Sequence, residues 1–131
     1  MSIESQLRAI AAQSVVKAEK VIRLTVNDIA NNTIIATPVL DGLLINNWLS
    51  GYSYSTSMHD IRDKSGSESQ GSLTQSLSAY SIGKTFYFTN SLPYADAIEN
   101  HGHSHRTPDG MLKKSIAQFD TIAQGYINQV K

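Results

Sequence analysis

The first 37 residues contain neither proline nor glycine, and this uninterrupted stretch constrains the fold more than any other feature. Within residues 1–35, apolar or small side chains recur at steps of three and four residues, at Leu7, Ile10, Ala11, Ser14, Ala18, Val21, Ile22, Thr25 and Ile29. This spacing predicts one long amphipathic helix over residues 1–35. At 1.5 Å per residue, roughly 28 helical residues would extend about 42 Å. A small sheet cannot cover that length, so we expect part of the helix to contact another chain.

Two strands follow a turn. Pro38 and Gly42 predict the turn, and the sequence WLSGYSYST, which begins at Trp48, then alternates from one side chain to the next. This alternation indicates a strand over 48–56 with its aromatic side chains on the buried or partly buried face. The run KTFYFTN at 84–90 predicts a second strand because aromatic and β-branched residues favour extended backbone.

Two further helices are expected near the C-terminus. Residues 92–99 predict a short helix with Pro93 in its first turn, where a missing N–H costs nothing. A last helix is expected to start at 107–109 and to carry an apolar stripe. The predicted fold class is therefore α+β, with a long N-terminal helix packed on a small antiparallel sheet and a C-terminal helix. Residues 1–131 form one domain in this prediction.

Residues 59–78 are rich in Ser, Gly, Asp and Gln, which is the composition of a loop. A short helical turn near 73–80 is compatible with it. The apolar side chains that can anchor this segment are Ile61, Leu73 and Leu77. We therefore expect a polar arm that is mobile in the isolated subunit and orders against a neighbouring molecule.

The composition excludes several classes of protein. Eleven Lys and Arg balance eleven Asp and Glu, so the chain lacks the basic surplus that tight nucleic-acid binding requires. It contains no cysteine, which rules out disulfides and thiolate metal ligands. No apolar run is long enough for a membrane span, and the amphipathic start does not resemble a signal peptide. A soluble protein made in the cytoplasm is expected.

The segment NHGHSHRTPDG carries His101, His103 and His105 at alternate positions. Three imidazoles can hold zinc and leave a fourth position open, so a metal-binding enzyme is one alternative. A catalytic zinc also needs a general base and fixed partners for its ligands, and no second ligand motif such as HExxH occurs. Asp96 and Glu99, three residues apart, form a pair of a kind that is usually solvated. We expect loop histidines without a metal, no catalytic residue and no cofactor.

Two blocks of sequence resemble a known family. The first is TPVLDGLLINNW at 37–48, and the second runs from GKTFYFTNSLPYADAIE at 83–99 to Ser104 and to PDGM at 108–111. In this order they resemble the neck or tail-completion proteins of long-tailed bacteriophages, the family of the lambda Z-type minor tail proteins. The matching positions include Pro38, Gly42, Trp48, Asn90, Pro93, Tyr94, Glu99, Gly102, Pro108, Gly110 and Met111. Between Glu99 and Gly102 the chain has one residue more than the family pattern.

The matching residues can also be explained, without the family, as residues that stabilise the fold. Pro38 and Gly42 redirect the chain, and Trp48 is expected to fill the interface between helix and sheet. Residues 90–94 end a strand and start a helix, with Tyr94 and Ile98 expected to pack back on the core. Pro108 and Gly110 are expected to start the last helix.

The resemblance implies a structural protein of the virion, located at the head–tail connection and assembled in the cytoplasm of the host bacterium. Its copies would form a homo-oligomeric ring, six-fold in the family, and contact other neck, tail-tube or connector proteins. DNA would only pass through the lumen, and no membrane would be involved. A tail terminator protein, which also caps the tail as a ring, is the alternative within the same setting.

Overall fold

A computed structural model describes residues 1–101, 104, 107 and 109–131 of the chain. In chain order its elements are α1 (Ile3–Gln13), α2 (Val15–Ala36), a 3₁₀ turn (Ile45–Asn47), β1 (Leu49–Gly51), α3 (Ser67–Ser78), β2 (Tyr87–Thr89), α4 (Pro93–His101), α5 (Leu112–Ile116) and α6 (Phe119–Val130). The predicted α+β fold class is confirmed, because a long N-terminal helix, an antiparallel sheet and a C-terminal helix are all present.

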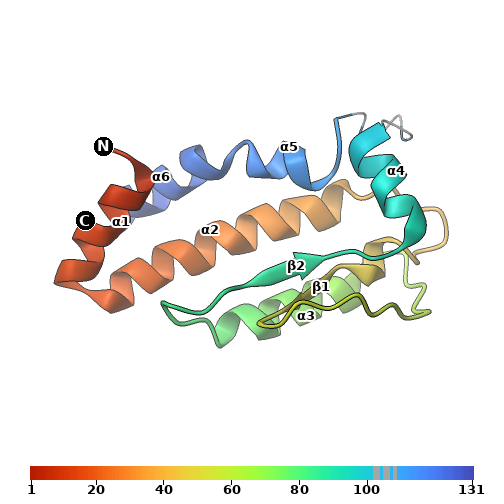
Figure 1. Cartoon of the computed structure of the whole chain (residues 1–131), viewed down its shortest axis with the longest axis horizontal. Helices are drawn as coiled ribbons and strands as arrows, with labels where there is room; N and C mark the ends of the chain where they lie inside the picture. Colours follow the sequence, from red (N-terminus) through yellow and green to blue (C-terminus); the bar gives the residue numbers. More distant parts are fainter. Residues whose placement is uncertain (102–103, 105–106, 108) are drawn as a thin grey trace.

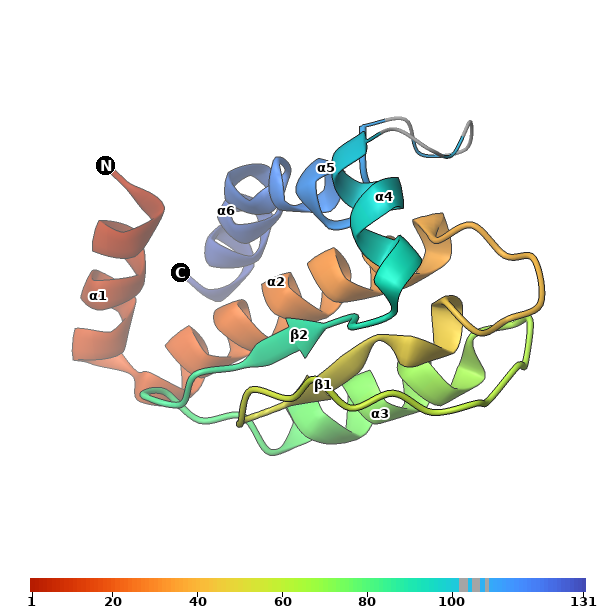
Figure 2. The ribbon, with the colours of Figure 1, turned by 45° about the vertical axis from the view of Figure 1, so that its right-hand side comes forward.

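Helix α2 runs through the middle of the molecule (Figure 1). Helices α5 and α6 lie along one side of α2, and the sheet with α3 lies along the other (Figures 1 and 2). Helix α1 folds back beside α6, so that both termini lie at the same end of the long axis, which we call the α1 end. The opposite end, formed by α4 and the loop after α2, is called the α4 end.

The predicted single helix over 1–35 is divided into α1 and α2 at Ser14. The backbone of Ser14 is extended, with φ −158° and ψ 109°. Its N–H donates to the carbonyl of Ile10 at 2.7 Å, and its Oγ accepts from the backbone N–H of Lys17 at 3.3 Å. Ser14 thus ends α1 and caps the N-terminus of α2, a role in which a short polar side chain competes with the helix. The stripe of apolar residues continues across the break.

The strands are shorter than predicted. β1 and β2 pair antiparallel in the register Leu49 with Thr89, Ser50 with Phe88 and Gly51 with Tyr87. The segment after Gly51 still follows β2, since Thr89 Oγ1 donates to the carbonyl of Ser55 at 3.2 Å. The prediction of a strand over 48–56 was therefore wrong in length. The backbone pairing ends at Gly51, and beyond it the hydrogen bond to Ser55 comes from the side chain of Thr89.

The prediction of a polar arm over 59–78 is corrected by α3, which occupies Ser67–Ser78. Leu73 and Leu77, 1% and 3% exposed, lie in the core and are not free anchors. The serines satisfy the backbone of the neighbouring strand, since Ser69 Oγ donates to the carbonyl of Trp48 and Ser76 Oγ to that of Ser50. A serine-rich helix thereby covers the outer edge of β1, which would otherwise expose unpaired backbone groups.

The last helix begins at Leu112, later than the predicted start at 107–109, and it is also interrupted. α5 ends at Ile116, and the N–H of Gln118 donates to the carbonyl of Ser115, a bond three residues back that tightens the chain before α6. Pro93 is the first residue of α4, as predicted.

The core consists of two clusters. The larger cluster is built on the α4 half of α2 and contains Ala30, Ile34, Leu44, Ile45, Trp48, Leu73, Leu77, Leu92, Ala95 and Met111. The smaller cluster joins α1, α2 and α6 through Ile10, Ala18, Val21 and Ile127. No helix in the described part of the chain is both long and apolar enough to cross a membrane.

Candidate functional site

Trp48 connects the end of α2 to the sheet, as the sequence indicated. Its side chain is 4% exposed and stacks on Phe88 with ring centroids 4.7 Å apart. Its Nε1 donates to Thr37 Oγ1 at 2.9 Å, and Thr37 Oγ1 donates to the carbonyl of Thr33 at 2.8 Å. The indole is therefore buried with its polar atom satisfied, which fixes the position of the sheet against α2.

Gly42 allows two distant loops to approach each other. Its φ is +89°, and a Cβ at this position would lie 2.7 Å from the backbone of Arg62. Just after the turn, Asn46 Nδ2 donates to the carbonyls of Gly42 at 2.8 Å and Asp63 at 2.6 Å. The segment before α3 is thus held against the turn that follows α2.

Asn47 binds the same segment a few residues earlier. Its Nδ2 donates to the carbonyl of His59 at 3.1 Å, and its Oδ1 accepts from the N–H of His59 at 3.0 Å. Asn46 and Asn47 are both fully buried, and each bonds to backbone groups far away in sequence. Asn46 was not predicted from the sequence as a functional or structural residue. An amide pair inside the apolar run LLINNW does, however, indicate such a buried network.

Asn90 leads the chain from β2 into α4. Its Nδ2 donates to the carbonyl of Leu44 at 2.9 Å, and its Oδ1 accepts from the N–H of Leu92 at 3.2 Å. Pro93 then begins the helix without needing a backbone donor. Asn90 therefore joins the start of α4 to the turn beside Trp48.

Glu99 joins α4 to α5. Its Oε1 accepts from the N–H groups of Met111 and Leu112 at 2.8 and 2.9 Å, and its Oε2 accepts from Lys113 at 2.9 Å. These N–H groups lie at the start of α5, where a carboxylate is favoured by the exposed donors and the helix dipole. Gly110, with φ +92°, comes so close to Glu99 that a Cβ would lie 2.7 Å from its Oε2.

Some predicted placements need correction or lie outside the described residues. Tyr94 was expected to pack back on the core but is 43% exposed, whereas Ile98 does pack against the larger cluster. Ile61 is 38% exposed and remains the accessible member of the predicted arm. Gly102 and Pro108, with His103 and His105, lie outside the described residues. Tyr94 faces outward because α4 turns its buried face, through Ala95 and Ile98, toward the core.

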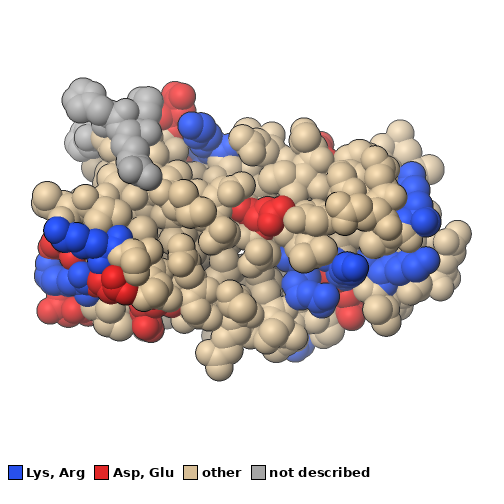
Figure 3. Space-filling view, turned by 180° about the vertical axis from the view of Figure 1, so that it is seen from behind, with Lys and Arg blue, Asp and Glu red and all other residues tan. Residues whose placement is uncertain are grey.

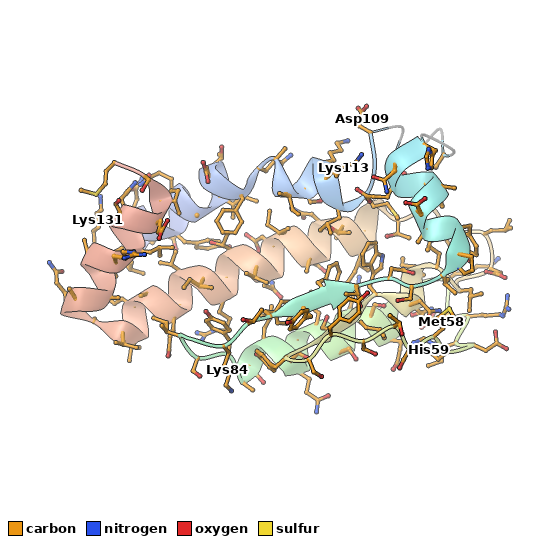
Figure 4. The ribbon with its side chains drawn as sticks, viewed as in Figure 1. Met58, His59, Lys84, Asp109, Lys113 and Lys131 are labelled. Atoms are coloured by element: carbon orange, nitrogen blue, oxygen red, sulfur yellow. The ribbon has the colours of Figure 1, made fainter. Side chains whose placement is uncertain are left out.

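A groove of about 560 Å³ lies between β2, α4 and α5. It is lined by the motif residues Trp48, Asn90, Pro93, Glu99 and Met111, together with Asp96 and Lys113. Figure 4 shows Lys113 and Asp109 on the outside of the connection between α4 and α5. The Glu99 carboxylate is committed to three backbone donors, and it is therefore not placed to act as a base.

The other ionisable groups of the groove serve local structure. A hydrogen bond from Asn100 lowers the pKa of Asp96, which keeps this carboxylate ionised. Among the described residues, no group of three or more His, Cys, Asp or Glu side chains could hold a metal ion. His101 lies at the end of α4 with Nε2 3.3 Å from Asp96. The polar side chains of this groove stabilise the contacts between helices and strands, and the groove leaves a surface that other molecules can contact.

Two apolar surfaces lie at opposite ends of the molecule. At the α4 end, the loop 38–41, which we call the knob, presents Val39 and Leu40 at 42% and 89% exposure beside Tyr94. At the α1 end, a hollow of about 460 Å³, called the α1 groove, is lined by Ile3, Leu7, Ala11, Ile22, Ile82 and Phe119. Large exposed apolar side chains grouped in this way are typical of contact sites between proteins.

Comparison with known proteins adds no relative. None of the family models, curated proteins or solved structures that we compared with the chain matches it.

Proposed function

We propose that this chain is a structural protein of a bacteriophage virion, a neck or tail-completion protein at the head–tail connection. It acts by assembling into a ring of identical copies at the head-proximal end of the tail. The proposal starts from the resemblance of residues 37–48 and 83–111 to that family. The family suggests six copies, and the neighbours are other neck, tail-tube or connector proteins.

One observation carries the proposal beyond the resemblance. The residues shared with the family hold the fold together: Trp48 joins α2 to the sheet, Asn90 joins β2 to the turn at Leu44, and Glu99 caps α5. Such a pattern is expected where a sequence is constrained by the shape of a subunit. An enzyme would instead require reactive side chains free to meet a substrate.

The charge of the chain is compatible with DNA that passes through a ring without being gripped. The formal net charge is zero, so copies arranged around a lumen add no overall basic field. Tight binding to phosphates requires clustered Lys and Arg that release counterions. The ring therefore forms a passage for DNA in this proposal, and the partners that it binds are proteins.

Electron microscopy of particles assembled without this protein tests the proposal. We expect filled heads and separate tails, and joined particles when the wild-type chain is supplied in trans. Tails of irregular length would assign the chain to a tail terminator instead. Normal joined particles in its absence would overturn the proposal.

Two variants serve as the negative and positive controls of this complementation. Trp48→Ala should fail to restore joining because the subunit is unfolded, whereas a surface change such as Thr74→Ala on α3 should restore it.

A further inference from the structure

The knob is a projection that is anchored at both ends. Pro38 limits the backbone at its start, and Asp41 Oδ1 accepts from the N–H of Leu43 at 3.0 Å at its end. The carboxylate of Asp41 also pairs with Arg62, which lies against Gly42. Leu40, 89% exposed, therefore projects into solvent from a loop whose ends are held by these contacts. A preorganised apolar side chain loses little conformational entropy on binding.

The α1 groove is an apolar hollow at the end of the molecule opposite the knob. It lies between α1, the start of α2 and the start of α6, and its floor is formed by Leu7, Ala18 and Ile22. Its rim carries Glu4, Arg8 and Asp120. An apolar floor inside a charged rim is the usual arrangement of a protein contact site.

The two ends differ in charge. Residues 1–25, 79–86 and 117–131, which form the α1 half, contain six Lys or Arg and three Asp or Glu. The described residues of 26–78 and 87–116, which form the α4 half, contain four Lys or Arg and eight Asp or Glu. On one face, Figure 3 shows mainly Lys and Arg at the α1 end and a mixture of basic and acidic residues at the α4 end. Figure 4 shows Lys84 and Lys131 in the α1 half, with Met58 and His59 in the other. When two copies meet head to tail, the more basic half of one therefore faces the more acidic half of the other.

From this complementarity we propose that the occupant of the α1 groove is the knob of a second copy of the chain. Leu40 of one copy enters the groove of the next, and the basic α1 half faces the acidic α4 half. The contact is heterologous, because two different surfaces meet, and such contacts close into a ring when each step includes the right rotation. This inference rests on the proposed function for the ring and names the surfaces that join its subunits.

The absence of cysteine permits a direct test by cross-linking. Leu40→Cys and Arg8→Cys place one thiol on the knob and one on the rim of the groove. Under mild oxidation we expect disulfide-linked dimers when the two variants are mixed, and far fewer with either variant alone. A chain carrying both substitutions should give a ladder that ends at the size of the closed ring.

The control pairs Leu40→Cys with Thr74→Cys, an exposed position on α3 outside both surfaces. The inference is overturned if the Leu40 and Arg8 pair cross-links no better than this control. It is equally overturned if Leu40→Cys alone gives as many dimers as the mixture, because the contact would then be two-fold symmetric.

Self-association measured by light scattering gives a second readout. Leu40→Asp should weaken it at least about tenfold, since an apolar side chain in the contact is replaced by a charge. Ile116→Asp on α5 is the matched control: an exposed apolar residue in neither surface, which should leave association within about twofold of wild type. Equal weakening by both would contradict the inference. Cross-linking between knob and groove combined with normal particles in the absence of the protein would refute only the proposed function.

Discussion

The two ends of this molecule are held together by different means. At the α4 end, Asn46, Asn47, Asn90 and Glu99 reach backbone groups of other segments around the larger cluster. At the α1 end, a small apolar cluster is supplemented by bonds between side chains. Gln6 and Gln124 exchange hydrogen bonds at 2.9 and 3.1 Å, and the Tyr126 hydroxyl donates to Asp28 at 2.6 Å. Directional bonds to buried backbone specify one arrangement, whereas a small apolar contact specifies its geometry less tightly. We therefore expect the α1 end to open at lower free energy.

The largest expected effect is the loss of Trp48. Trp48→Ala should cost about 3–5 kcal/mol, because it removes a buried ring that stacks on Phe88 and bonds to Thr37. A total stability of about 5–15 kcal/mol leaves such a subunit largely unfolded. Ile10→Ala in the smaller cluster should cost about 2 kcal/mol, the low end for its class. Thermal unfolding of both variants measures their losses of stability. Equal losses would contradict the difference between the two clusters.

Gly42→Ala should cost about 2–4 kcal/mol. The backbone has a positive φ, and the added methyl group meets the main chain of Arg62 and Asp63, which cannot move aside cheaply. Gly71→Ala is the matched control, because Gly71 lies in α3 with nothing within 4 Å of an added Cβ. That change should stabilise the protein by about 0.5–1 kcal/mol. Denaturant unfolding measures both changes in stability. If Gly42→Ala does not destabilise the protein, the 59–63 segment does not lie against Gly42.

Glu99→Ala should cost about 1–3 kcal/mol by leaving the first N–H groups of α5 without their acceptor. The amides of Met111, Leu112 and Lys113 should exchange faster with solvent in this variant. Glu99→Gln keeps one acceptor oxygen and should recover part of the loss. If all three amides exchange as in the wild type, Glu99 is not the cap.

The smallest effect depends on pH. Hydrogen bonds from Ser67 and Ser65 lower the pKa of Asp63 below its ordinary 3.8. A carboxylate with a lower pKa in the folded protein stabilises it above the unfolded pKa, and that stability is lost as the pH falls through the folded value. Asp63→Asn should therefore be less stable than the wild type at pH 7, and the difference should shrink as the pH falls below 3.8. Ser67→Ala should reduce the same pH dependence, and a difference constant with pH would refute the assignment.

Much of the α4 end was predictable from the sequence. Pro38, Gly42, Trp48 and Pro93 fall where the sequence placed the turn, the buried ring and the start of α4. These residues restrict the backbone or carry a large apolar surface, so each acts through local chemistry that a sequence displays. Glu99 was named as a motif position and as one of two nearby carboxylates, but its role as a cap was not predicted, because its partners lie twelve to fourteen residues away.

The errors have a common physical origin. Ser14 breaks the first helix without proline or glycine, since its side chain caps α2 while the apolar stripe continues past it. The high serine content of the α3 segment led to the prediction of a loop. Ser69 and Ser76 in fact bond to the backbone of β1, and Leu73 and Leu77 face the core one turn apart. Polar side chains that bond to distant backbone groups have no signature in local composition.

Hydrogen exchange of the free subunit and of the assembled particle, compared segment by segment, tests the central claim that a preformed subunit joins its copies through its ends. We expect residues 67–78 to be protected already in the free subunit, because α3 lies in its core. Assembly should add protection at 38–41 and at the α1 groove and little elsewhere along α3. Rapid exchange across 67–78 in the free subunit, with protection gained there on assembly, would contradict the account.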